Sequence, residues 1–149
     1  SHLGDWMIGR GNGYFITKTY SGLSMILYNY EHFSRLFARG EFFRMTNENR
    51  YTPFTRMDSV FFQVVIKNLP GKKCLIKEQF INQEHGSSFD LWVKMGASQV
   101  IPSDMEEVLR SGARPGMFVH QEHIADGTLK FEAVLEPLEV RLVEIECVE

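Results

Sequence analysis

The chain has 149 residues, of which 44% are hydrophobic and 23% are charged, so it can bury the core of one domain and is too apolar to be disordered. A net charge of −3 and a pI near 6.0 argue against the broad basic surface of a nucleic-acid-binding domain, and no apolar run approaches the roughly 20 residues that span a bilayer. Aromatic residues are unusually frequent, at 13%.

The ends of the chain and its cysteines bear on what kind of protein it is. The chain begins Ser-His-Leu-Gly instead of with Met, which indicates that residues 1–4 are a cloning remnant and that residues 5–149 are one domain excised from a longer protein. Cys74 and Cys147 are too few for a disulfide scaffold. Whether the two thiols pair is left open by the sequence.

The first part of the chain carries strand patterns. Residues 14–20 are rich in aromatic and β-branched side chains, and residues 23–30 continue this pattern after the turn signal Ser21-Gly22. These stretches predict a hairpin. Residues 60–67 alternate apolar and polar side chains, and a Pro-Gly turn separates them from a strand over 75–82, which predicts a second hairpin.

Strand patterns return near the end. Residues 117–124 and 129–135 flank the turn signal Asp126-Gly127, so we expect them to pair as a third hairpin. In the last strand, over 138–147, the apolar residues change from one face to the other after position 142. A strand repeats every two residues, so this change predicts a bulge or a change of partner sheet.

Helical signals are short and lie between the strands. The spacing of Phe33, Leu36 and Phe37 before Gly40 predicts one or two turns of helix. A second short helix is expected over 87–96, capped by Ser87 or Ser88 and ended by Gly96. A third should begin with a capping box at residues 103–106 and end at Gly112. The sequence therefore predicts an all-β fold, an antiparallel β-sandwich of seven or eight strands with short helical insertions.

The sequence offers little that is typical of catalysis. His120 and His123 are three apart on a strand, so they point to opposite faces and would not share a metal ion. Glu84 and Asp90 could be read as the carboxylate pair of a glycosidase. A cap and turn cluster is the favoured interpretation, because Asp90 falls in the first turn of a helix. We therefore expect no catalytic, cofactor-binding or metal-ligating residues and no cofactor.

Three stretches are distinctive when taken together. They are residues 11–18 with 26–30, residues 82–96 with their Glu-His-Gly and Trp-x-x-Met-Gly elements, and residues 135–145. In order and spacing they resemble the C-terminal β-sandwich that follows the barrel in family 39 glycoside hydrolases, the β-xylosidase and iduronidase group. Residues 50–54 are also similar to a subset found in AraC-type (arabinose-regulator) transcriptional regulators, which carry such a module after a helix-turn-helix domain.

The resemblance implies a non-catalytic role. In that family the catalytic glutamates lie on a (β/α)8 barrel, and no carboxylate of this chain matches their motifs. The implied function is an accessory domain that packs on and stabilises a sugar-recognising barrel of the same polypeptide, in a cytoplasmic regulator or a glycosidase, with no direct contact to DNA and no membrane. Aromatic residues dominate such interfaces, so we take the following as interdomain contact candidates: Trp6, Tyr51, Phe54, Phe89 and Trp92.

Two other functions remain open at this point. A free-standing carbohydrate-binding module would present an exposed row of Tyr or Trp beside polar groups, with carbohydrate as its partner. Most aromatic residues here fall on apolar faces, which favours burial instead. A small glycosidase acting through Glu84 and Asp90 is the remaining alternative.

Overall fold

The computed structural model describes residues 7–40 and 46–148, and within them the chain forms eight strands and three short helices. Their bounds are β1 Met7–Gly11, β2 Tyr14–Lys18, β3 Gly22–Tyr28, α1 Arg35–Ala38, β4 Val60–Ile66, β5 Lys73–Ile81, α2 Ser88–Lys94, α3 Ser103–Gly112, β6 Gly116–His123, β7 Leu129–Leu135 and β8 Val140–Val148. None of the helices in this described part is long and apolar enough to cross a membrane.

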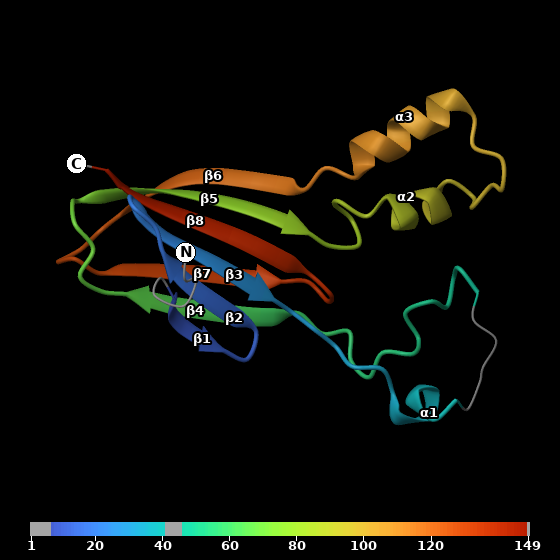
Figure 1. Ribbon diagram of the computed structural model, residues 1–149, viewed down its shortest axis with the longest axis horizontal. Coiled ribbons are helices and arrows are strands. Elements are labelled where there is room, and N and C mark those ends of the chain that lie inside the picture. Colours follow the sequence, from blue (N-terminus) through green and yellow to red (C-terminus); the bar gives the residue numbers. More distant parts are fainter. Residues whose placement is uncertain (1–6, 41–45, 149) are drawn as a thin grey trace.

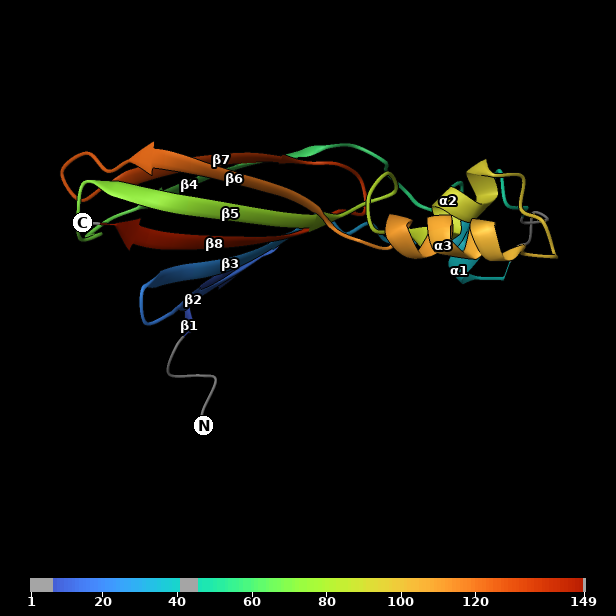
Figure 2. The same ribbon diagram turned by 90° about the horizontal axis from the view of Figure 1, so that it is seen from above.

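The strands form two antiparallel sheets. The larger sheet has six strands in the order β1-β2-β3-β8-β5-β6, and the smaller pairs β4 with β7 (Figure 1). The smaller sheet covers one face of the larger one (Figure 2). The all-β sandwich with short helical insertions is therefore confirmed.

The core lies between the two sheets and follows from alternation along the strands. In β7 every second residue is buried, from Leu129 to Leu135, and the residues between them are exposed. Burying one face of each strand removes its apolar side chains from water, which is the main favourable contribution to folding. Residues of β3, β5 and β8 complete the core from the larger sheet, including Met25, Leu27, Ile76, Val143 and Ile145.

Only the first of the three predicted hairpins is confirmed. β2 and β3 pair in register around the turn at residues 19–21. β4 does not pair with β5, because β4 bonds to β7 in the small sheet while β5 lies between β8 and β6. β6 does not pair with β7 for the same reason.

The turns behind the two wrong hairpins carry the chain from one sheet to the other. Asn68 and Gly71 have positive φ in one turn, as do Asp126 and Gly127 in the other. The two turns touch, since the Leu69 N–H donates to the Gly127 carbonyl oxygen at 2.9 Å. β4, β5 and β7 turn apolar side chains to one core, so their pattern is the same whichever strand is the partner. β6 contributes no residue to that core.

The predicted bulge or sheet change in the last strand is also wrong. β8 pairs with β3 and β5 in unbroken register. Leu138 precedes the strand, in a turn with φ of 61°. Val140 is exposed on the outer face of the larger sheet, whereas Val143 and Ile145 face the core. The apparent change of phase therefore arises because both faces of β8 carry apolar side chains.

The three helices lie beyond one end of the sandwich, which we call the helical end (Figures 1 and 2). α1 follows β3, and α2 and α3 lie between β5 and β6. α2 begins as expected, because the Ser87 hydroxyl accepts a hydrogen bond from the Asp90 N–H. The capping box of α3 is not formed: its N-cap is Pro102 and no side chain caps it.

Candidate functional site at the helical end

The buried side-chain amide of Asn29 holds together the strand ends that lie next to the helical end. Asn29 is 4% exposed, and its Nδ2 donates to the carbonyl oxygens of Asp58, Leu135 and Glu136 at 2.8, 3.3 and 3.0 Å. Its backbone N–H donates to the Glu139 carbonyl oxygen at 2.9 Å. The residue after β3 thus holds the approach to β4 and the end of β7 together, across both sheets.

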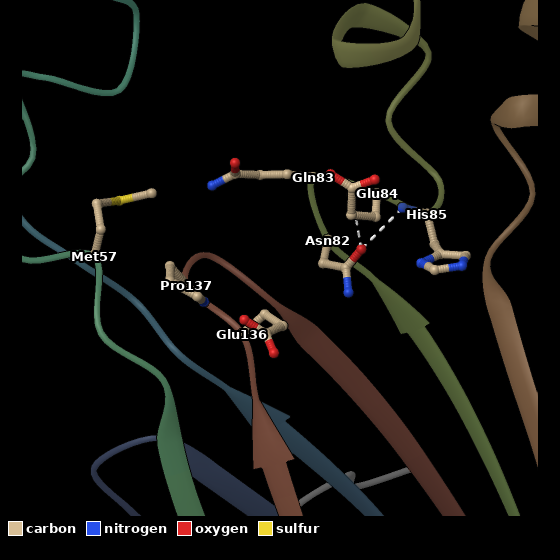
Figure 3. A pocket seen from close by; sticks show the side chains of 7 residues that line it. All are labelled: Met57, Asn82, Gln83, Glu84, His85, Glu136 and Pro137. Atoms are coloured by element: carbon tan, nitrogen blue, oxygen red, sulfur yellow. Dashed lines mark hydrogen bonds between the residues drawn. The ribbon is translucent and has the colours of Figure 1, made fainter.

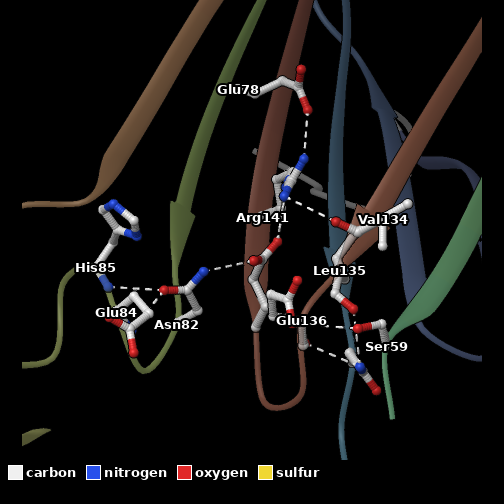
Figure 4. Close-up of polar contacts among 11 residues, drawn as sticks. Ser59, Glu78, Asn82, Glu84, His85, Val134, Leu135, Glu136 and Arg141 are labelled. Carbon is white, nitrogen blue, oxygen red and sulfur yellow. Dashed lines mark hydrogen bonds and ion pairs between the residues drawn. The ribbon is translucent and has the colours of Figure 1, made fainter.

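A buried ionic network lies beside this amide (Figure 4). Arg141 Nη2 lies 2.7 Å from a carboxylate oxygen of Glu139, and Arg141 Nη1 lies 3.0 Å from one of Glu78. Asn82 Nδ2 donates to the other Glu139 oxygen at 2.9 Å. Buried charges are tolerated only when they are paired and hydrogen-bonded, and within the described residues every buried side-chain nitrogen and oxygen has a partner.

Substituting Arg141 measures how much this network contributes to the free energy of unfolding. Arg141→Met leaves Glu78 and Glu139 buried without their cation, so we expect urea unfolding to show a loss of about 3–5 kcal/mol. The matched control is Lys77→Met, which breaks the exposed ion pair between Lys77 and Glu144 at 3.7 Å and should cost less than about 1 kcal/mol. Equal losses in both variants would contradict this assignment.

Asn82 also starts the segment that leads to α2. Its Oδ1 accepts hydrogen bonds from the N–H groups of Glu84 and His85 at 3.0 and 2.8 Å. The same residue therefore joins the ionic network to the base of the helical end. A surface pocket of about 460 Å³ opens here (Figure 3), lined by Met57, Asn82, Gln83, Glu84, His85, Glu136 and Pro137.

Asp90 is the polar centre of the helical end. Its carboxylate accepts hydrogen bonds from the Tyr51 hydroxyl at 2.6 Å, from the Arg50 guanidinium and from the Ser87 hydroxyl. Asp90 is 4% exposed. These bonds tie the loop before β4 to the first turn of α2, although the two segments are 40 positions apart in the chain.

An unbroken row of ring contacts crosses the helical end from α1 to α2. Phe33 lies against Phe37 and Phe54, with ring centroids 4.9 and 5.0 Å apart, and Phe54 lies 6.3 Å from Tyr51. The Arg50 guanidinium covers the rings of Tyr51 and Phe89 at 4.7 and 5.6 Å, and Phe89 lies 5.6 Å from Trp92. We call these seven side chains the aromatic row.

The aromatic row contains four of the five contact candidates from the sequence. Tyr51, Phe54, Phe89 and Trp92 are brought together by the structure, and Trp6 lies outside the described residues. Phe89 is half exposed, whereas the Trp92 indole N–H donates to the Ser98 carbonyl oxygen at 2.9 Å and its ring is partly buried. Phe33, Phe37 and Arg50 were not singled out as contact candidates, because none of them stands out in the sequence from the many other aromatic and basic residues.

The other polar residues considered from the sequence lie apart or are paired. Glu84 is exposed and forms an ion pair with Lys94 at 2.7 Å. His120 Nε2 lies 2.9 Å from a Glu78 oxygen, on the face of β6 opposite to His123. Within residues 7–40 and 46–148, no group of three His, Cys, Asp or Glu residues is arranged to hold a metal ion.

The hydrogen bonds to Asp90 determine its pKa. Burial alone would raise the pKa, but the bonds from Ser87, Tyr51 and Arg50, with the positive charge of Arg50, outweigh it and hold the Asp90 pKa below its usual value. The pKa of Tyr51 is raised, first by burial and then by its bond to Asp90. Both shifts favour an ionised carboxylate and a neutral phenol, which fit a hydrogen bond from the Tyr51 hydroxyl to Asp90.

The stability that Asp90 contributes to the fold should therefore depend on pH. Because its pKa is lowered by folding, the stability it contributes is present above the ordinary carboxyl pKa of about 3.9 and is lost as the pH falls through the lowered value. We expect Asp90→Asn to lower the free energy of unfolding at pH 7 by about 2–4 kcal/mol. In urea titrations, the difference in the free energy of unfolding between this variant and the unsubstituted chain should become smaller as the pH falls from about 5 to about 2.

The control for this variant is Asp58→Asn. Asp58 forms an exposed ion pair with Arg56 at 3.7 Å, so its loss should change stability by less than about 0.5 kcal/mol. An Asp90→Asn effect of the same size, or one that does not narrow in acid, would show that Asp90 does not hold the helical end together.

Comparison with known proteins gives one sequence relative. No family model matches the chain. A β-xylosidase of Geobacillus stearothermophilus is 34% identical over 71 residues, which are 48% of this chain and 14% of that enzyme. The match therefore covers only a small part of the enzyme's length.

Solved structures share the fold of nearly the whole chain. A monomeric β-xylosidase from Caulobacter crescentus CB15 superposes with a TM-score of 0.71 at 12% identity, over 94% of this chain and 27% of that one. A family 39 glycoside hydrolase from Xanthomonas axonopodis pv. citri gives 0.72, also at 12% identity, over 95% and 27%. A bacterial orthologue of human α-L-iduronidase gives 0.60 at 10% identity, over 91% and 22%. The chain thus has the fold of about a quarter of each of these enzymes.

Proposed function

We propose that this chain is a non-catalytic accessory domain that packs through its helical end on a sugar-recognising (β/α)8 barrel of the same polypeptide and stabilises it. The observation that carries the proposal is the aromatic row, a chain of partly exposed ring contacts held in place by the ion pair between Arg50 and buried Asp90. The fold of this chain also supports the role. It matches about a quarter of each β-xylosidase-type chain, and the larger part of those enzymes lies outside the shared fold.

The chemistry of the aromatic row suits a domain contact. Phe33 and Phe89 are each 51% exposed, and neighbouring Leu36 in α1 is 58% exposed. Aromatic and arginine side chains in the centre of an interface contribute most of its binding energy. Arg50 is held by Asp90 and by two rings, so little side-chain entropy would be lost when a partner covers it.

The carboxylates support a role without catalysis. A glycosidase needs one carboxyl to donate a proton and a second to attack or to activate water. The oxygens of Asp90 are taken up by three side chains, and Glu84 pairs with Lys94 on the surface. The proposed arrangement therefore leaves the chemistry of the parent protein to the barrel.

Two parents are compatible with this role. One is a glycoside hydrolase similar to the β-xylosidases, and the other is a cytoplasmic, sugar-responsive transcription regulator of the AraC type. In the second, DNA is bound by a separate domain, in keeping with the net charge of −3 of this chain. The reading frame upstream distinguishes them: strand-end glutamates on a barrel indicate the hydrolase, and a helix-turn-helix domain indicates the regulator.

A surface substitution at the helical end tests the docking. In the full-length polypeptide, Phe89→Ala should lower the melting temperature of the barrel by about 3–6 °C, because it removes an anchor from the interface. The matched control is Phe61→Ala, whose ring is 59% exposed on the outer face of the small sheet. Differential scanning calorimetry measures both, with the isolated chain as the reference for effects on this domain alone.

Two results would count against the proposal. The first is an unchanged barrel transition in Phe89→Ala, or an equal shift in Phe61→Ala. The second is a reading frame without a barrel in front of this domain. Deleting the domain provides an independent check, since it should lower both the melting temperature and the soluble yield of the barrel.

A specific pocket favours carbohydrate binding as the second candidate function. It measures about 380 Å³ beside the end of β3, with polar Asn12, Glu31 and His32 around Tyr28 and Tyr30. Tyr30 is 63% exposed and packs edge-on against His32, with ring centroids 4.9 Å apart. An exposed ring beside polar groups is the arrangement that binding sites for polar ligands use.

Titration with xylo-oligosaccharides tests this candidate. If the pocket binds sugar, the amide signals of the chain should shift saturably with a Kd below about 1 mM, which corresponds to about −4 kcal/mol. Tyr30→Ala should then weaken binding at least tenfold, whereas Tyr20→Ala, at an exposed turn between β2 and β3, should not. No saturable shift below about 10 mM would exclude sugar binding as the function.

A further inference from the structure

The two cysteines lie opposite each other on two neighbouring central strands of the larger sheet, near the ends of those strands. Cys74 in β5 and Cys147 in β8 are direct partners in the antiparallel register. The Cys147 N–H donates to the Ser21 carbonyl oxygen at 3.2 Å, on the side of β3. Both backbone groups of a strand residue point to the same neighbour, so Cys147 makes no ladder bond to Cys74, and the two form a non-hydrogen-bonded pair.

That class of pair suits a disulfide. Opposite residues in a non-hydrogen-bonded pair have Cα atoms about 4.5 Å apart and side chains closer than in the bonded class. Disulfides join Cα atoms about 4.4–6.8 Å apart. Both side chains lie on the core face of the sheet, because Ile76 and Ile145, two positions away on each strand, belong to the core. Both thiols are free in this structure.

The two thiols differ in their access to solvent. Cys74 is fully buried, whereas Cys147 is half-buried. Cys147 also lines a surface pocket of about 360 Å³, together with the β2–β3 turn and residues 66–70. The β2–β3 turn and the β4–β5 connection, which line this pocket, lie at the end of the sandwich opposite to the helical end (Figure 1). A small reagent can therefore reach Cys147 first, without disturbing the aromatic row.

We propose that Cys74 and Cys147 form an oxidisable dithiol site that reacts with a small disulfide, such as oxidised glutathione, to give a disulfide between β5 and β8. The Cys147 thiolate attacks one sulfur of the reagent, forms a mixed disulfide and releases one thiol. The Cys74 thiolate then attacks the Cys147 sulfur and releases the second thiol. The protein loses two protons and two electrons, and the reagent is reduced to two thiols.

The surroundings of the site make this reaction slow at neutral pH. Burial raises the pKa of both thiols, and the nearby Cys147 raises that of Cys74 further. The thiolate is the reacting form, so the rate should increase about tenfold for each pH unit up to the raised pKa of Cys147. The product encloses residues 74–147, about half of the chain, and joins two central strands.

Peptide mass spectrometry under non-reducing conditions tests the proposal. The whole chain, incubated with oxidised glutathione at pH 8.5, should lose two hydrogen atoms and yield one cross-linked peptide that contains both cysteines. Its melting temperature should rise by about 5–15 °C and return on reduction with dithiothreitol. In Cys74→Ala the reaction should stop at the mixed disulfide on Cys147, and in Cys147→Ser the buried Cys74 should not react.

Several outcomes would overturn the proposal. One is the absence of the cross-linked peptide in the unsubstituted chain, with glutathione retained on Cys147. Others are disulfides formed only between chains, or modification of Cys74 in Cys147→Ser at the rate seen for Cys147. The unsubstituted chain carries the decisive measurement, so a variant that fails to fold does not affect the conclusion. The site lies far from the helical end, so failure of the docking proposal would leave this one standing.

Discussion

The fold depends on a polar constraint at the end of the sandwich from which the helices depart. Asn29 follows β3 of the larger sheet, and its side-chain amide bonds to three carbonyl oxygens at the ends of β4 and β7 in the smaller sheet. Its own N–H bonds to the carbonyl oxygen of Glu139, whose carboxylate pairs with Arg141. Hydrophobic burial holds the two sheets together but is not directional. Buried hydrogen bonds are directional, and leaving one unmade is costly. The network therefore fixes where the strands end and where the connecting segments leave the sandwich.

The same logic extends into the helical end, where α1, α2 and α3 bury no apolar residue. The hydrogen bonds of Asp90 hold the segments there together, because its carboxylate joins α2 to the loop that carries Arg50 and Tyr51. With Arg50 fixed, its guanidinium contacts the rings of both Tyr51 and Phe89 and links the two parts of the aromatic row. Exposing aromatic rings to water is unfavourable, which is the reason for proposing that a partner covers the aromatic row.

The sequence predicted the elements much better than their pairing. Alternation identified strands such as β4 and β7, and turn residues located both crossings between the sheets. It did not reveal that β4 pairs with β7, because strands that face one core have the same pattern with any partner. The candidates Tyr51, Phe54, Phe89 and Trp92 came from composition and resemblance. These side chains lie together because Arg50 contacts Asp90 across two distant segments of the chain, and no local sequence pattern encodes that contact.

Hydrogen–deuterium exchange would test the central claim most directly, namely that the helical end is a surface built to be covered. Backbone exchange would be compared between the isolated chain and the same residues in the full-length polypeptide. The account predicts that exchange slows in residues 46–56 and in α2, and stays unchanged in β6 and on the small sheet. Equal exchange at the helical end in both forms, or slower exchange in β6 alone, would contradict it.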